Sequence, residues 1–242
     1  MSSTVITPGG RVGAPARAHV AHGALILLAT VLIGLREWAL QHYGPPPFDG
    51  RDYLMQLLTV EDLRMPWSSL FYLHYQPPVW PFIERLSYEL TGGQALVWGL
   101  NKVASYVMAL CMWGVLRPWT TAWRAGIAAL VALMLPETAI YEAWDYSSHF
   151  IMMLFAVNVW LFSMALRHPD KRPTWAWAWV LSFLVLGLTR QTYLVVALAA
   201  LLWVFGVKAL SLPRRTALVM LLVMASPIVA WQAKNQWLFG TA

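Results

Sequence analysis

Two carboxylates, Asp49 and Asp52, stand three positions apart in a polar, proline-rich segment of an otherwise apolar chain. On a helical turn this spacing places both side chains on one face, and Arg51 lies between them in the sequence. A carboxylate in such a setting serves as a general base, as a ligand for a divalent cation, or as a solvated part of a loop. The spacing alone leaves these three interpretations open.

A second group of candidate residues lies farther along the chain, where Glu142 and Asp145 precede His149. His, Asp and Glu side chains are ligands of divalent metals, but this spacing matches no dedicated metal motif. The favoured interpretation is a hydrogen-bonded wall of a polar cleft, with a metal site as the alternative. His74 either faces the same cleft or caps a helix that lies along the membrane interface.

The composition places these residues in a membrane protein. Hydrophobic residues make up 59% of the 242 residues and charged residues only 12%, against about 25% in soluble domains. The single cysteine, Cys111, excludes an intramolecular disulfide and a cysteine metal cluster. The sequence has no glycine-rich phosphate loop, so no nucleotide cofactor is expected. The net charge of +6 comes from dispersed basic residues, so nucleic acid is not an expected partner.

Apolar runs of membrane-spanning length recur along the chain, since about 20 residues cross a hydrocarbon core of about 30 Å. The predicted fold is therefore all-α: a polytopic bundle of about seven transmembrane helices. It forms one domain, residues 21–242, after a disordered cytoplasmic tail, residues 1–20. A large first outer loop, residues 41–94, is expected to carry interfacial helices. The spans are expected at residues 21–40, 95–116, 124–141, 149–166, 174–189, 191–208 and 216–234.

The charges of the connections predict the orientation of the bundle. One alternating set of connections holds ten basic residues and a single acid, Asp170. The other set holds the remaining seven basic residues and ten acids. By the positive-inside rule the N-terminus is cytoplasmic, while the loop at residues 41–94 and the C-terminus are extracytoplasmic. The expected location is a plasma membrane, such as a bacterial inner membrane.

The fifth and sixth spans form a short hairpin around Arg190. Residues 174–208 provide 35 residues, or about 52 Å of helix, for two crossings that need about 60 Å. The turn is therefore expected below the outer surface. A recessed arginine meets an anion, snorkels to the surface, or pairs with a carboxylate such as Glu142 or Asp145.

Other polar residues have simpler expected roles. Glu84, Arg85 and Glu89 lie on a short amphipathic stretch and are expected to form surface pairs. Asn158 lies inside a span and is expected to bond to a neighbouring helix. Lys102 is expected to snorkel outward.

The order of these features resembles the GT-C superfamily of glycosyltransferases, which use sugars linked to a polyprenyl phosphate and include protein mannosyltransferases and lipid A and arabinose transferases. After the first span come an Asp-x-x-x-Tyr motif, interfacial helices and a Pro-Pro-x-x-Pro return to the membrane. The residues of these motifs are Asp49 and Tyr53, then Pro77, Pro78 and Pro81. The resemblance extends to the proline in the third span at Pro136, the aromatic loop 141–146 and the Thr189-Arg190 hairpin.

The resemblance implies roles for individual residues. Asp49 takes the place of the base that deprotonates the acceptor hydroxyl, and Asp52 is the alternative base or a metal-binding partner. Arg190 takes the place of the basic residue that contacts the lipid phosphate, with Lys234 second. A divalent cation is a possible cofactor, and the expected partners are membrane lipid and the lipid-linked sugar. The further substrate-binding candidates are Tyr53, His74, Gln76, Glu142, Asp145 and His149.

The chain also departs from the superfamily pattern. Gly50 follows Asp49 where members often have Asp-Glu, and Gln76 replaces the usual His before the paired prolines. Members usually continue with more spans, so a chain ending at Ala242 is expected to be a minimal or truncated module. The alternative function is a non-catalytic membrane subunit of the same fold within a larger protein complex. A transporter is disfavoured, because ionisable residues cluster near the span ends.

Overall fold

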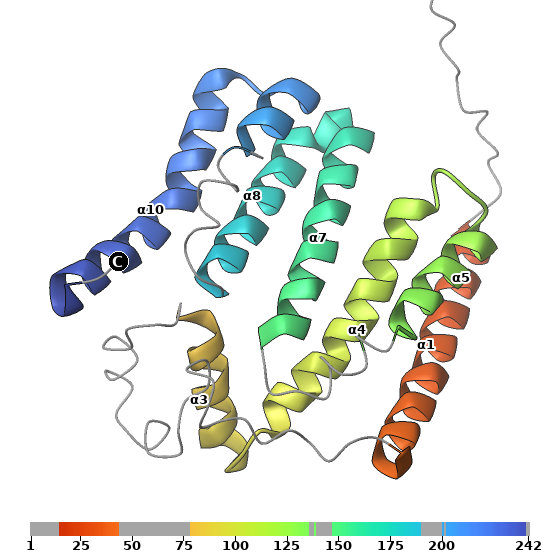
Figure 1. Ribbon diagram of the computed structural model, residues 1–242. Coiled ribbons are helices and arrows are strands. Elements are labelled where there is room, and N and C mark those ends of the chain that lie inside the picture. Colours follow the sequence, from red (N-terminus) through yellow and green to blue (C-terminus); the bar gives the residue numbers. More distant parts are fainter. Residues whose placement is uncertain are drawn as a thin grey trace, which may run out of the picture.

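The computed structural model describes residues 15–43, 78–135, 138, 147–189, 200 and 202–240. All elements within these residues are helices, which confirms the predicted all-α class. Figure 1 shows the long helices side by side, with the shorter α3 below them. In chain order the elements are α1 (Pro15–Tyr43), α3 (Val79–Thr91), α4 (Ala95–Leu116), α5 (Ala122–Leu133), α7 (Ser147–Arg167), η2 (Pro169–Lys171), α8 (Arg172–Thr189), η3 (Leu202–Ala209) and α10 (Arg214–Phe239).

Three of the described helices, α4, α7 and α10, are long and apolar enough to cross a membrane. Helix α4 coincides with the predicted second span, 95–116. Helices α7 and α10 contain the predicted fourth and seventh spans, 149–166 and 216–234. Large apolar side chains stand exposed on them, such as Val103, Val159 and Leu222, as expected for surfaces that face lipid.

Helix α1 is longer than the predicted first span, 21–40, at both ends. It includes residues 15–20, which the prediction assigned to a disordered tail. The reason lies in the residues themselves, because Ala16 and Ala18 are strong helix formers. Pro15 occupies the first helical position, where proline's fixed φ suits the helix and its missing N–H is not needed.

Helix α5 ends at Leu133, well before the end of the predicted third span, 124–141. Pro136 has no N–H to donate to the carbonyl of Ala132, four residues earlier, so the helix cannot continue regularly. The hydroxyl of Thr138 donates to that carbonyl instead, at 3.0 Å. The prediction noted the proline but underestimated its effect on the length of the helix.

Helices α7 and α8 are joined by a polar contact in the middle of the bundle. The amide of Asn158 donates to the hydroxyl of Ser182 at 2.8 Å, and its carbonyl oxygen accepts from the indole N–H of Trp179 at 2.9 Å. The Ser182 hydroxyl in turn donates to the carbonyl of Trp179 at 2.7 Å. The predicted bond from Asn158 to a neighbouring helix is confirmed.

Two hydrophobic cores share α4. One core joins α4 with α3, α7, α8 and α10, and it includes the fully buried Met220 and Met224. The other joins α4 with α1 and α5, where the fully buried Ala125 and Ala129 allow close packing. Helix α4 is therefore the central support of the described structure.

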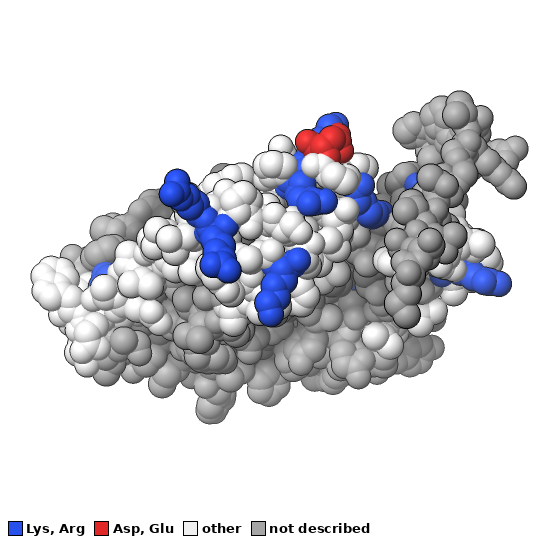
Figure 2. All heavy atoms as spheres, turned by 90° about the horizontal axis from the view of Figure 1, so that it is seen from above, with Lys and Arg blue, Asp and Glu red and all other residues white. Residues whose placement is uncertain are grey.

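The bundle has a basic end, formed by residues 117–124, 167–172 and 208–215. There α4 and α7 end, and α5, α8 and α10 begin. Figure 2 views the structure from this side and shows Lys and Arg side chains around one acidic group. Asp170 is the only acid in these three connections, as the sequence requires.

Candidate functional site

Buried polar side chains are unevenly distributed along the bundle. In the part of the chain that the structure describes, none of them belongs to the basic end. By their positions along the helices, Asn158 and Ser182 lie in the middle, and the others lie toward the opposite end, which we call the polar end. Its buried polar residues are Arg36, Glu84, Arg85, Ser87, Asn101, Ser105, Thr138, His149, Thr189, Lys234 and Asn235.

His149 lies in the first turn of α7 and is completely buried against α4. Its Nε2 atom is 2.9 Å from the hydroxyl oxygen of Ser105, which is also completely buried. Because imidazole and hydroxyl both donate and accept, the direction of this bond follows the tautomer of the ring. His149 is thus a polar link between α4 and α7. The predicted cleft wall stays a prediction, because Glu142 and Asp145 lie outside the described residues.

Helix α3 closes the polar end from below, where it contacts α4 and α8. Its Trp80 is buried, and the Trp80 ring lies 5.8 Å from the ring of Phe150 on α7, centroid to centroid. Glu84, one turn after Trp80, is only 1% exposed. The expectation that Glu84 lies at the surface is therefore wrong, because it shares the buried face of α3 with Trp80.

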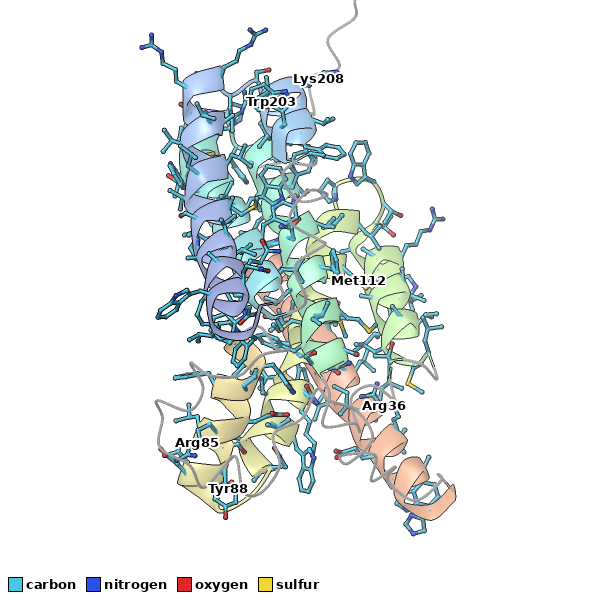
Figure 3. All side chains as sticks on the ribbon, turned by 60° about the vertical axis from the view of Figure 1, so that its left-hand side comes forward. Arg36, Arg85, Tyr88, Met112, Trp203 and Lys208 are labelled. Atoms are coloured by element: carbon cyan, nitrogen blue, oxygen red, sulfur yellow. The ribbon has the colours of Figure 1, made fainter. Side chains whose placement is uncertain are left out.

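The neighbouring residues of α3 behave differently. Arg85 bonds to Glu89 through Nη2 at 3.1 Å, so the predicted pairing is confirmed. However, Arg85 is itself buried, and Figure 3 shows Arg85 and Tyr88 at the lower end of the molecule. The pair is thus only half at the surface, since the Glu89 side chain is 38% exposed.

The turn between α3 and α4 fixes α3 in place. Gly92 has φ 71°, a left-handed conformation that favours glycine, and its N–H donates to the carbonyl of Tyr88 at 2.8 Å. The buried hydroxyl of Ser87 donates to the carbonyl of Gly93 at 2.7 Å and accepts from the N–H of Leu96 at 3.1 Å. These bonds fix the orientation of α3, the helix that carries Glu84, relative to α4.

The C-terminal ends of α8 and α10 complete the polar end. Helix α8 stops at the buried Thr189, whose hydroxyl donates to the carbonyl of Val185 at 2.7 Å. The Nζ atom of Lys234 lies 3.6 Å from the centroid of the Trp231 ring, which is a cation–π contact. Lys234 is 9% exposed, and Asn235 beside it is also buried.

Charged residues of α1 hold this helix to its neighbours. The guanidinium of Arg36 is buried and donates to the carbonyl of Leu133 at 2.6 Å, so it caps the C-terminus of α5 (Figure 3). The next residue, Glu37, bonds to Lys102 of α4 at 2.6 Å. Lys102 is half-exposed, as snorkelling requires, but it also has this specific partner.

Most of the predicted site residues lie outside the described residues. Of the set, only His149 and Lys234 are described, and both lie at the polar end. The structure does not join them, because His149 bonds to α4 while Lys234 lies over a ring of its own helix. The described residues contain no group of three or more possible metal ligands. The predicted residues outside the described part are Asp49, Asp52, Tyr53, His74, Gln76, Glu142, Asp145 and Arg190.

Sequence reasoning missed the buried positions of Glu84 and Arg36, although a signal for both was present. Trp80, Glu84 and Ser87 follow the i, i+4, i+7 spacing of one helical face, and all three are buried. Arg36 continues the buried stripe Leu25, Ala29, Ile33 at the same kind of spacing. A charged residue within an apolar stripe indicates a buried partner.

The polar end thus offers a buried carboxylate, an imidazole, a lysine and amide groups from α3, α4, α7 and α10 at the edge of an apolar bundle. Comparisons of the chain with protein-family models, curated proteins and solved structures found no match.

Proposed function

We propose that the chain is an integral membrane glycosyltransferase of the GT-C type, which transfers a sugar from a polyprenyl-phosphate carrier to an acceptor at the extracytoplasmic face. The observation that carries this proposal is the concentration of buried polar side chains at the polar end, opposite the basic connections. The motif residues Asp49 and Tyr53 follow α1, which ends with Tyr43 at that same end.

The proposed topology has seven spans, with the basic end in the cytoplasm and the polar end outside. Helices α4, α7 and α10 provide three spans by length and composition. Helices α1, α5 and α8 and the segment that ends in η3 provide the other four. The distribution of basic residues supports the direction, since the connections at the basic end contain one acid, Asp170.

The proposed chemistry requires a base and a charge partner for the leaving group. Asp49 removes the proton from the acceptor hydroxyl as its oxygen bonds to the anomeric carbon of the sugar. The bond from that carbon to the phosphate oxygen breaks, and the electron pair leaves with the polyprenyl phosphate. Arg190 stabilises the phosphate charge, with Lys234 as the second candidate.

The length of α8 supports this position for Arg190. The helix has 18 residues and is about 27 Å long, slightly less than the hydrocarbon thickness of about 30 Å. Arg190 follows its last residue directly. An arginine at this depth is costly in lipid and is stabilised by an anion such as a lipid phosphate.

The remaining roles concern metal and substrate binding. Asp52 is the alternative base or a ligand for a divalent cation, because hard cations prefer carboxylate oxygens. Glu142 and Asp145 form part of the wall around the substrate, and the buried His149 supports this wall through its bond to Ser105. If sugar transfer stops when divalent cations are chelated and recovers when Mg²⁺ or Mn²⁺ is added, the result would support the role of Asp52 as a metal ligand.

The test is sugar transfer by the purified chain from a polyprenyl-phosphate donor, using the variants Asp49→Asn and Asp170→Asn. Both changes neutralise one aspartate, but Asp170 lies at the basic end. Asp49→Asn is expected to lower transfer at least about 100-fold, the scale of a lost general base, while Asp170→Asn retains activity. Undiminished transfer by Asp49→Asn would refute the assignment. Absence of transfer by the unchanged chain, with stable co-purification of another membrane protein, would favour the subunit alternative.

A further inference from the structure

The basic end contains a cluster of cations that the proposed reaction does not use. We call it the basic patch. It has six basic residues, of which five are exposed and Arg172 is half-buried. Asp170 is the only acid in the connections that carry it. The members of the basic patch are Arg167, Lys171, Arg172, Lys208, Arg214 and Arg215.

A hydrogen bond joins the two connections that carry the basic patch. Nη1 of Arg172, at the start of α8, donates to the carbonyl of Leu210 at 3.2 Å. Leu210 is fully buried and lies between η3 and α10, so it anchors the second connection against the first. The cations of the two connections therefore lie at the same end of the bundle, where Figure 2 shows Lys and Arg side chains around one acidic group.

Helix polarity adds to the positive charge of this surface. Helices α8 and α10 both begin here, at Arg172 and Arg214, and the N-terminus of a helix carries partial positive charge. Basic residues in a first turn are therefore unfavourable unless an anion lies nearby. No side chain caps the start of α10, where the cap residue is Pro213. The uncapped N–H groups and the cations all favour a negatively charged ligand.

Aromatic residues next to the basic patch favour a lipid over a soluble anion as its ligand. Helix η3 exposes Trp203 and Phe205, which are 43% and 40% exposed. Figure 3 shows Trp203 and Lys208 on η3 beside the beginning of α10. Tryptophan and basic residues together are typical of the level of lipid head groups. A soluble anion would need the cations but not the exposed rings.

The geometry points to a binding surface for anionic phospholipid at the basic patch, in the leaflet that faces the basic end. The phosphate and acidic head group contact Arg214, Arg215 and Lys208, and the acyl chains lie along the exposed apolar side chains of η3. Because α7 ends and α10 begins here, head groups of the surrounding leaflet lie at this height. This inference does not depend on the glycosyltransferase assignment.

The experiment is native mass spectrometry of the full chain in an uncharged detergent, titrated with phosphatidylglycerol or with phosphatidylcholine of the same acyl chains. Preferential binding of phosphatidylglycerol that weakens with added salt is expected. The double variant Arg214→Gln/Arg215→Gln should lower the affinity for phosphatidylglycerol about 30-fold, since each basic residue near an anionic surface adds about a factor of five.

A matched control is the double variant Arg117→Gln/Arg124→Gln. It removes the same charge from exposed arginines at the same end, but from the connection between α4 and α5. Exposed tryptophans, Trp119 and Trp123, lie beside these arginines too, so the control tests whether binding needs the cluster of six cations. The control variant should bind phosphatidylglycerol nearly as the unchanged chain does, and Arg214→Lys/Arg215→Lys should restore most of the binding. Equal losses in both glutamine variants would overturn the inference. Equal binding of phosphatidylcholine and phosphatidylglycerol would also overturn it. Full displacement of phosphatidylglycerol by millimolar inorganic phosphate would overturn it too, because it would indicate a site for a free anion.

Discussion

Asn158 illustrates how a single residue stabilises contact between apolar helices. Its side chain bonds to Trp179 and Ser182 on α8, and all three residues are buried. In a lipid environment an unsatisfied polar group is costly, so removal of Asn158 leaves the indole N–H of Trp179 without this acceptor. These hydrogen bonds therefore stabilise the packing of α7 against α8.

The variant Asn158→Leu is expected to lower the free energy of unfolding by about 1 to 2 kcal/mol. Titration with a denaturing detergent, followed by circular dichroism, measures this change. Val159→Leu on the next position, which is 53% exposed, serves as the control and should be nearly neutral. Equal stability of Asn158→Leu and the control would show that the network contributes little.

At the residue scale the sequence predicted the bond of Asn158 but not the burial of Glu84. A polar residue within a long apolar run must find a partner in a neighbouring helix, and this constraint is local. Glu84 lies in a short amphipathic segment, where the sequence pattern gives two faces but does not show which one packs against the bundle. That choice depends on contacts with α4, α7 and α8, which lie far away in the sequence.

At the scale of elements, the contact between α4 and α7 at Gly114 leaves no room for a larger side chain. A Cβ atom at this position would lie 2.8 Å from Nε1 and 2.9 Å from Cδ1 of Trp160 on α7. The Trp160 ring is itself packed edge-on against Trp175, with centroids 5.8 Å apart. It therefore has little freedom to move away, and glycine is required for the packing of α4 on α7.

The variant Gly114→Ala is expected to be less stable than Gly126→Ala by about 1 to 3 kcal/mol, the usual cost of overpacking. Both changes gain the same helix propensity, but a Cβ at Gly126 meets only ordinary contacts at 3.9 and 4.0 Å. Unfolding midpoints of the two variants measure the difference. Adding Trp160→Phe to Gly114→Ala should recover part of the lost stability. Equal stability of Gly114→Ala and Gly126→Ala would contradict the observed packing.

The elements themselves were predictable to different degrees. Helix α4 matches its prediction because a continuous apolar run of membrane length leaves no other choice. Helix α5 does not, because Pro136 interrupts it and its last carbonyls bond to a nearby side chain, Thr138, and a distant one, Arg36. Hydropathy alone cannot indicate where a helix ends when side chains satisfy its terminal carbonyls.

At the scale of the whole molecule, the two ends of the bundle differ in chemistry. The basic end carries exposed cations, and the polar end carries buried polar groups, in the part of the chain that the structure describes. The charge asymmetry was predictable from the sequence, because connections alternate between the two sides of a membrane. The buried polarity was not, because it arises where α3, α4, α7, α8 and α10 meet.

This asymmetry predicts the orientation in cells. In a Cys111→Ala background, a single cysteine at Thr91→Cys, beside the polar end, should react with a membrane-impermeant maleimide added to intact cells or spheroplasts. A cysteine at His168→Cys, in the basic end, should react only after the membrane is permeabilised. Both positions are exposed, so accessibility within the protein is matched. The reverse pattern would overturn the proposed topology and place Asp49 on the cytoplasmic side.

The most direct test of the proposed function is an experimental structure of the full chain with a bound polyprenyl-phosphate sugar. The proposal predicts that the lipid phosphate lies at the polar end beside Arg190, with the anomeric carbon facing Asp49. Density for a helix of another protein in that space, with no lipid phosphate between the two residues, would contradict it.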